Sequence, residues 1–197
     1  FLTHHNTLDL DMQMRIANEL FLKRLIVGGF DKVYEMGKMF RNEGISVKHN
    51  PEFTNIELYA AYEDYDYMMR ITENVVAHCA EIVHGSTVVN FQGTEIDFKA
   101  PWKRVSMHTL VEEKTGVDFY GFETDEEARN AAKELKLSGI EIEKDMTKGL
   151  IVSYLFEELC EQDLVQPVFV LHHPVEISPL SKRNAENPFY TDRFEAF

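Results

Sequence analysis

The segment from Phe40 to Tyr59, FRNEGISVKHNPEFTNIELY, holds six side chains that could bind a charged ligand. They comprise a guanidinium, an imidazole, two carboxylates and two aromatic rings, carried by Arg41, Glu43, His49, Phe53, Glu57 and Tyr59. A planar guanidinium inside a cavity suits a phosphate or a carboxylate, which it holds through two N–H groups. A ligand ammonium buried beside one carboxylate and one phenol is charge-compensated and hydrogen-bonded, as burial demands. The residue types therefore predict a polar cavity that presents these groups to one ligand.

Two strands joined by a polar loop are expected to position these side chains. With a period of two, Arg41 and Glu43 share one face of the first strand. The second strand has a polar face and an apolar core face, formed by Phe53, Asn55, Glu57 and Tyr59 and by Thr54, Ile56, Leu58 and Ala60. A solvent face rarely combines two aromatic rings with a carboxylate and a facing Arg–Glu pair, so the polar face is expected to line the cavity.

The rest of the chain predicts an α+β fold. An amphipathic helix is expected over residues 12–26, ended by Gly28 and Gly29, and a strand over 32–36. Asp64 or Asp66 is expected to cap a helix that runs to about residue 84. Further helices are expected from residue 106 to near 116, from 124 to about 136 and over 148–162, and further strands within 87–98, over 168–171 and over 191–197. Since strands and helices do not alternate regularly, an antiparallel sheet flanked by helices is expected.

The composition of the chain limits the classes of protein to which it can belong. The 197 residues are 44% hydrophobic and 12% aromatic, which indicates a globular chain, and one domain is the default at this length. A formal net charge of −14 argues against a stand-alone RNA-binding module.

Cys79 and Cys160 lie far apart and favour neither a disulfide framework nor a zinc site, so a reducing cytosol is the simplest interpretation. No apolar run approaches the ~20 residues that span a bilayer. Without an initiator Met, and with structure expected from its first residues, the chain is expected to be a fragment.

The FRNE strand, its loop and the second strand closely resemble the second signature motif of the class II aminoacyl-tRNA synthetases. The longer wording FRNEGISVKHNPEFT, followed by ELY, resembles the lysine-specific branch of that family. The resemblance extends upstream through FLTHHNTLDLDMQMRIANELFLKRLIVGGFDKVYEMG and downstream to HHPVEISPLSKRN and TDRFEAF. It implies that residues 1–197 form part of one class II catalytic domain, an antiparallel sheet flanked by helices. A helical insertion is expected around residues 118–148, where the resemblance is weakest.

The resemblance implies a binding site for ATP with Mg²⁺. Arg41 would bridge the α-phosphate and the amino-acid carboxylate, and would steady the charge that builds on phosphorus. Glu43 would receive the adenine amino group, Phe53 would stack on the adenine ring, and His49 would approach the triphosphate. Glu195, in TDRFEAF, matches a carboxylate that binds magnesium, a hard cation that prefers oxygen ligands.

The resemblance also implies a lysine site beside the ATP site. Tyr59 would meet the side-chain ammonium of lysine, Glu57 and Glu19 would help to hold its amino groups, and Arg41 its carboxylate. The family usually has Pro where this chain has Asn18, a departure expected to affect the local backbone more than the Glu19 carboxylate. Without the resemblance, Arg41 paired with Glu43 on a sheet surface and Glu19 on a solvated helix face would be the plainer interpretations.

The implied function is that of a lysine–tRNA ligase, which activates lysine with ATP and transfers it to tRNA(Lys). The parent protein is expected to be a cytoplasmic homodimer. The third signature motif and an anticodon-binding domain are not found in these 197 residues, so we expect the chain by itself to be weakly active or inactive. Two alternatives stay open. One is a paralogue that attaches a lysine-like group to a protein such as elongation factor P, and the other is a non-catalytic, synthetase-like binding module.

Overall fold

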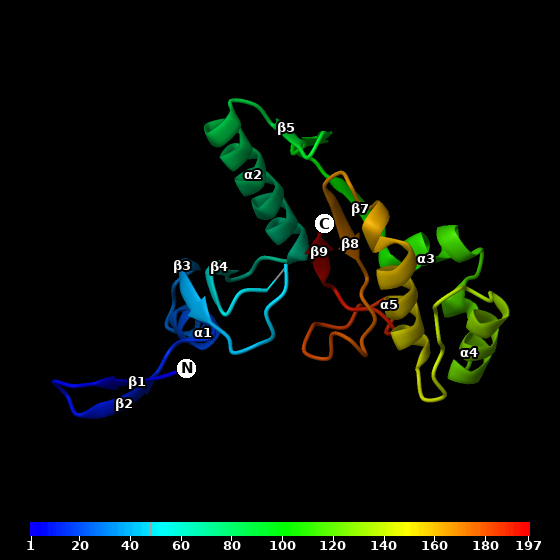
Figure 1. The fold of residues 1–197 in the computed structure, drawn as a ribbon, viewed down its shortest axis with the longest axis horizontal. Helices are drawn as coiled ribbons and strands as arrows, with labels where there is room; N and C mark the ends of the chain where they lie inside the picture. Colours follow the sequence, from blue (N-terminus) through cyan, green and yellow to red (C-terminus); the bar gives the residue numbers. More distant parts are fainter. Residues whose placement is uncertain (48) are drawn as a thin grey trace. The chain divides into compact units, whose positions relative to one another are not determined.

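A computed structural model describes residues 1–47 and 49–197 of the chain. The described residues form two compact units, Phe1–Glu63 and Asp64–Phe197. Helices and small sheets are combined in the way that the α+β prediction requires (Figure 1). The described strands form four small sheets, and one of the strand pairs, β7 with β8, is parallel where an antiparallel arrangement was expected. That residues 1–197 belong to one catalytic domain stays a prediction.

The first unit consists of two hairpins and one helix. Its elements are β1 (Leu2–His5), β2 (Leu10–Gln13), α1 (Glu19–Val27), β3 (Lys32–Phe40) and β4 (Glu52–Ala60). The prediction of a helix from residue 12 is wrong, because Met12 lies on β2 and pairs with Thr3. Helix α1 begins only at Glu19 and ends before Gly28, as expected. Gly29 follows at a φ of +100°, a backbone conformation that favours glycine.

The β3–β4 hairpin is the frame of the first unit. Its register runs from Lys32 opposite Ala60 to Phe40 opposite Glu52, nine antiparallel pairs in all. The polar face lies beneath α1 and the segment before it, where Leu22 and Met39 are buried. The opposite face was predicted to be core, and this is wrong for the first unit. Three of its side chains are open, with Tyr34 72%, Met36 68% and Ile56 48% exposed, whereas Leu58 and Ala60 are half-buried.

The second unit holds most of the hydrophobic core. Its elements are α2 (Tyr65–His84), β5 (Val88–Phe91), β6 (Thr94–Asp97), β7 (Lys103–Ser106), α3 (Met107–Thr115), η1 (Phe119–Gly121), α4 (Asp125–Glu134), α5 (Lys148–Leu159), η2 (Glu161–Asp163), β8 (Val168–Leu171) and β9 (Phe194–Ala196). Two helix starts are confirmed, since the Asp64 carboxylate accepts from the Tyr67 N–H and Thr124 forms a reciprocal capping box with Glu127. Helix α5 ends at Leu159 and β9 begins at Phe194, so both are shorter than expected. None of the helices in the described part of the chain combines the length and the apolar character needed to cross a bilayer.

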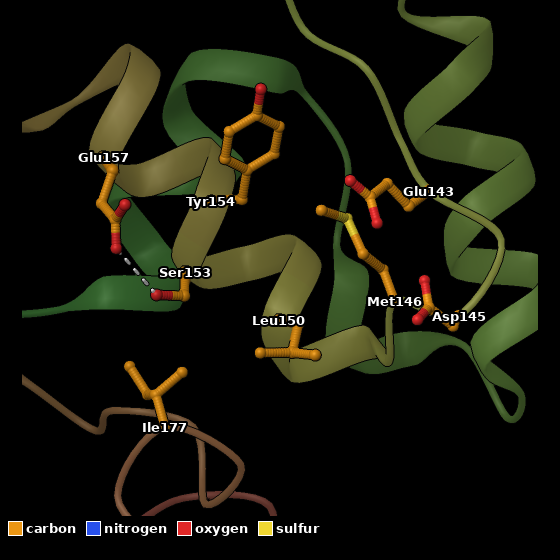
Figure 2. Close-up of a pocket in the computed structure, with 8 residues that line it drawn as sticks. All are labelled: Glu143, Asp145, Met146, Leu150, Ser153, Tyr154, Glu157 and Ile177. Atoms are coloured by element: carbon orange, nitrogen blue, oxygen red, sulfur yellow. Dashed lines mark hydrogen bonds between the residues drawn. The ribbon is translucent and has the colours of Figure 1, made fainter.

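Helix α5 packs one side on the larger core and turns the other side to an acidic cavity. Its buried residues include Ile151, Leu155 and Phe156, which join Val111 of α3 in the core. The cavity has a volume of about 350 Å³ and is lined by Glu143, Asp145, Met146, Leu150, Ser153, Tyr154, Glu157 and Ile177. Figure 2 shows Ser153 donating to the Glu157 carboxylate one turn along the helix, at 3.3 Å.

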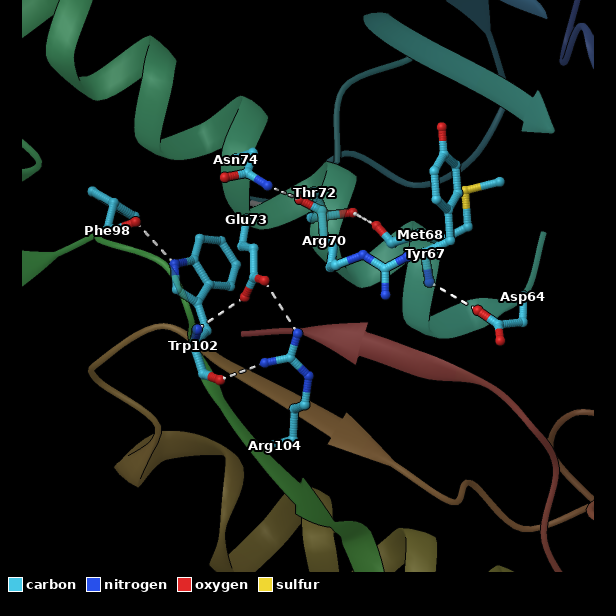
Figure 3. Close-up of polar contacts among 10 residues, drawn as sticks. All are labelled: Asp64, Tyr67, Met68, Arg70, Thr72, Glu73, Asn74, Phe98, Trp102 and Arg104. Carbon is cyan, nitrogen blue, oxygen red and sulfur yellow. Dashed lines mark hydrogen bonds and ion pairs between the residues drawn. The ribbon is translucent and has the colours of Figure 1, made fainter. Parts of the chain in front are cut away.

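A buried ion pair joins α2 to the start of β7. Glu73 is 3% exposed and accepts from the Trp102 N–H at 2.9 Å and from the Arg104 guanidinium at 3.1 Å. Arg104 also donates to the Trp102 carbonyl at 2.9 Å, which closes a small network (Figure 3). The Trp102 ring stacks on Phe169 of β8 at 5.1 Å between centroids. The network therefore ties the α2 helix to one face of the three-stranded sheet.

Candidate functional site

A cavity of about 230 Å³ lies at the end of the β3–β4 hairpin, where the chain reverses. It is lined by Arg41, Glu43, Gly44, His49, Asn50 and Phe53. The structure therefore brings together the four residues predicted to bind ATP, from both sides of the loop. Lys48, in the same loop, lies outside the described residues.

Arg41 and Glu43 reach this cavity from the loop and not from a strand. Strand β3 ends at Phe40, so the prediction that both lie on one strand face is wrong. One more ladder bond joins the Arg41 N–H to the Pro51 carbonyl at 2.9 Å. Pro51 has no N–H with which to return that bond, and the ladder stops there.

The Arg41 guanidinium is held at one edge and open at the other. Its Nε donates to the Ile16 carbonyl at 3.2 Å, and its Cζ lies 5.4 Å from the Phe53 ring centroid. No further hydrogen bond to this guanidinium is made by the residues that the structure describes. The two terminal nitrogens are thus left available for a bidentate anion such as a phosphate or a carboxylate.

The rest of the cavity wall comes from the loop and from β4. The His49 Nδ1 lies 2.9 Å from the Ser46 hydroxyl, and two backbone hydrogen bonds join the same two residues, so the imidazole is oriented by a tight turn. Glu43 is exposed and Phe53 is half-buried. The wall therefore combines one ring, one imidazole and one carboxylate around the guanidinium.

Glu57 is the most constrained of the predicted lysine-binding residues. Its Oε1 accepts from the Asn18 N–H at 3.1 Å and from the Asn55 side-chain amide at 3.3 Å. Its Oε2 is buried and has no hydrogen-bond partner in the described part of the chain. A buried carboxylate oxygen without a donor costs free energy, so this oxygen marks a place for a donor from a ligand.

Glu19 and Tyr59 lie close to this carboxylate. The Lys23 ammonium forms an ion pair with Glu19 one turn along α1 and lies 5.9 Å from the Tyr59 ring centroid. Burial raises the pKa of the Tyr59 hydroxyl, and the nearby carboxylates of Glu19 and Glu57 raise this pKa further. The phenol therefore stays protonated at neutral pH, and the group is rich in negative charge.

Glu195 lies on β9 of the second unit. Its carboxylate forms an ion pair with Arg193 and lines a cavity of about 280 Å³ that also contains Glu157, Glu161 and His173. Among the described residues, no group of three or more His, Cys, Asp or Glu side chains is placed to hold a metal ion. Strand β9 thus offers magnesium a single carboxylate, that of Glu195.

Comparison with known proteins decides the family. The family described as tRNA synthetases class II (D, K and N) matches this chain over residues 1–197. The chain belongs to this family. Its relatives include the lysine–tRNA ligases of Clostridium acetobutylicum, Clostridium tetani and Thermoanaerobacter pseudethanolicus, which are 61%, 58% and 56% identical to it over 197 residues. All of this chain is covered in each comparison, but only 38%, 39% and 39% of those relatives.

The sequence alone did not reveal every residue that shapes the site of this class II chain. Asn55 shares the strand face of Glu57, and this spacing could have suggested the contact between them. In the sequence Asn18 stands out only as a departure from the usual Pro, while in the structure its N–H donates to the Glu57 carboxylate. Gly44 and Asn50 line the loop cavity, and their place between the predicted residues was the available signal.

Proposed function

We propose that this chain is the ATP- and amino-acid-binding part of a lysine–tRNA ligase. The observation that carries the proposal is the buried Glu57 oxygen without a donor, close to Tyr59 and Glu19. Within a family that includes aspartate, lysine and asparagine enzymes, such an acidic group suits a cationic amino acid. The names of the relatives, which are lysine–tRNA ligases, support the same choice.

The reaction would begin with the formation of lysyl-adenylate. A carboxylate oxygen of lysine attacks the α-phosphorus of ATP in line, a P–O bond forms, and the P–O bond to pyrophosphate breaks. The free terminal nitrogens of Arg41 would hold the carboxylate and the α-phosphate together and stabilise the charge on phosphorus. Phe53 would stack on the adenine, Glu43 would accept from its amino group, and His49 would contact the triphosphate.

The amino groups of lysine would be bound by the acidic cluster. Glu57 Oε2 and Glu19 would accept from them, and Tyr59 would meet the side-chain ammonium. A site built in this way rejects an analogue without the amine, because the buried Glu57 Oε2 would be left without a donor. No nucleophile from the protein is required for this step.

Magnesium would be held by Glu195. Mg²⁺ usually takes only one or two protein carboxylates and completes its shell with water and phosphate oxygens. The Arg193 ion pair engages one side of the Glu195 carboxylate, which leaves the other oxygen for the metal. When bound, Mg²⁺ would neutralise charge on the phosphates.

Transfer of the lysyl group to tRNA(Lys), homodimer formation and a cytoplasmic location are proposed for the parent protein. The helical segment around residues 118–148, which contains α4, is proposed as an insertion into the catalytic domain. The 197-residue chain alone is expected to be weakly active or inactive.

The test is amino-acid-dependent exchange of pyrophosphate into ATP, measured on the parent protein and on the 197-residue chain. Lysine, aspartate, asparagine and β-lysine would be compared. Exchange with lysine alone is expected from the parent protein. Preference for β-lysine would favour the protein-modifying paralogue, preference for aspartate or asparagine would refute the lysine site, and silence of the parent with all four would favour a non-catalytic module.

Arg41→Ala in the parent protein is expected to abolish exchange with little loss of stability, because this guanidinium is exposed and makes one hydrogen bond with the residues that the structure describes. Arg24→Ala is the matched control, since Arg24 is an exposed arginine on α1 that does not line the cavity. Near-normal exchange by Arg41→Ala would refute the role of Arg41.

A further inference from the structure

Two carboxylates face each other across the β3–β4 hairpin. Glu35 of β3 is in register with Glu57 of β4, and both lie on the polar face of the hairpin. Side chains directly opposite on antiparallel strands have Cβ atoms about 4.5–5.5 Å apart, and like charges at such positions repel each other. Other groups must therefore compensate the negative charge of this pair.

The two carboxylates are compensated in different ways. Glu35 forms an ion pair with the Arg15 guanidinium, whose Nε also donates to the Lys38 carbonyl at 2.8 Å. Glu57 has no cationic partner among the residues that the structure describes. Its Oε1 accepts from two neutral donors at 3.1 and 3.3 Å, and its Oε2 is buried without a donor.

The Arg15 guanidinium nevertheless lies within reach of Glu57. It covers Gly37, since a Cβ added to this glycine would lie 3.3 Å from the guanidinium carbon. Gly37 is opposite Asn55 in the hairpin and is therefore the diagonal neighbour of Glu57. Diagonal neighbours are ~7–8 Å apart, a distance that a long side chain can span. A buried carboxylate oxygen without a donor attracts such a cation, so the ion pair with Glu35 is what keeps Arg15 from it.

We propose that Glu35 is a positioning residue that holds the Arg15 guanidinium away from Glu57 and so keeps Glu57 Oε2 available to the substrate ammonium. The effect on lysine binding rests on the proposed function, whereas the competition of the two carboxylates for Arg15 does not. Without the charge of Glu35, the guanidinium pairs with Glu57 and competes with the ligand.

Substitutions that remove charge test this role in the parent protein, through the kinetics of pyrophosphate exchange. Glu35→Gln keeps the size of the side chain and removes its charge. It is expected to raise the KM for lysine about fivefold and to leave the KM for ATP unchanged, the size of effect that a partly exposed ion pair has. The side chains of Arg15 and Glu35 are 40% and 41% exposed, so water weakens the competing pair. Adding Arg15→Gln removes the competitor and should restore the KM for lysine.

Glu52→Gln is the matched control. Glu52 is also an ion-paired glutamate of the hairpin, but it binds Lys38 on the open face and should leave both KM values unchanged. An unchanged KM for lysine in Glu35→Gln, or an increase that Arg15→Gln does not reverse, would overturn the proposal. The reversal separates this role from a purely structural one, because damage to the fold would not be repaired by removing a second side chain.

A second measurement does not need activity. Equilibrium unfolding of the 197-residue chain would give the coupling free energy between Arg15→Gln and Glu57→Gln, first with Glu35 present and then in the Glu35→Gln background. The coupling is expected to grow when the guanidinium is released from Glu35, and equal couplings in both backgrounds would overturn the proposal. Lack of lysine exchange by the unmodified parent would instead refute the proposed function and leave this comparison valid.

Discussion

Replacing Glu73 by alanine should destabilise the second unit by about 3 kcal/mol, because it breaks a buried ion pair. Glu73 is 3% exposed and accepts from Trp102 and from Arg104. After the substitution, the Trp102 N–H loses its acceptor and the Arg104 guanidinium loses its counter-charge. The apolar packing of Met69 of α2 against Trp102 and Phe169 would remain.

The magnitude follows from these two lost partners. A buried N–H without an acceptor costs about 1–3 kcal/mol. Removing one partner of a buried ion pair costs about 3–5 kcal/mol, but the Arg104 side chain is 30% exposed, so water relieves part of that cost. Arg104 also keeps its bond to the Trp102 carbonyl. The lower end of the range, about 3 kcal/mol, is therefore expected.

The assay is urea unfolding followed by tryptophan fluorescence, because Trp102 is the one tryptophan of the 197 residues and belongs to the network. Glu81→Ala is the control, since Glu81 is an exposed glutamate on the same helix. A loss for Glu73→Ala within about 0.5 kcal/mol of the control, a typical effect of surface substitutions, would refute the reasoning.

Three further predictions concern local contacts. Gly37→Ala should destabilise the first unit by about 1 kcal/mol in chemical unfolding, because its Cβ would clash with the Arg15 guanidinium and displace it from the Lys38 carbonyl. Thr124→Ala should cost about 1 kcal/mol in the same assay by removing the cap of α4. Burial, with a smaller effect of Arg193, lowers the pKa of His173 to about 4 from 6.5. The unfolded chain therefore binds a proton between these values that the folded chain does not, and stability should fall, by up to about 1.4 kcal/mol per pH unit, as the pH falls from 6.5 towards 4.

Each of these predictions has a control. Gly44→Ala should be neutral for stability, because no residue that the structure describes lies within 4 Å of its added Cβ, and an equal loss at both glycines would contradict the Arg15 argument. Thr124→Ser keeps the hydroxyl acceptor and should retain the cap, so that a loss equal to that of alanine would exclude capping as the cause. For His173, an NMR titration of the imidazole with a midpoint near 6.5 would show that burial does not depress its pKa.

Local signals in the sequence were enough to predict where most helices begin and end. Asp64 and Gly85 bound α2, and the Thr124 to Glu127 spacing marks α4, because these residues satisfy backbone groups a few positions away. The mistakes fall where the outcome depends on distant residues. Met12 has a helical pattern but pairs with Thr3 across a hairpin. The pattern of side chains in one segment does not show which other segment will pair with it as a strand.

The candidate site shows the same difference between features set by nearby residues and features set by distant ones. The residues of the loop cavity could be named because they lie close together in sequence, and Phe53 was placed correctly by its period on β4. The hydrogen bond from Asn18 to Glu57 could not be foreseen, since Asn18 precedes Glu57 by 39 residues and donates through its backbone N–H. The type of a residue does not show where its backbone N–H donates, because every residue except proline has one.

The open face of the β3–β4 hairpin has a practical consequence for work with the isolated chain. Tyr34, Met36 and Ile56 place apolar surface on one side of a sheet that has only two strands in the first unit. Exposed apolar surface next to unpaired strand edges promotes self-association. We therefore expect the apparent molar mass from light scattering to rise with protein concentration. Binding and unfolding experiments on the 197-residue chain should accordingly be repeated over a dilution series, so that a property of one molecule is not confused with that of an aggregate.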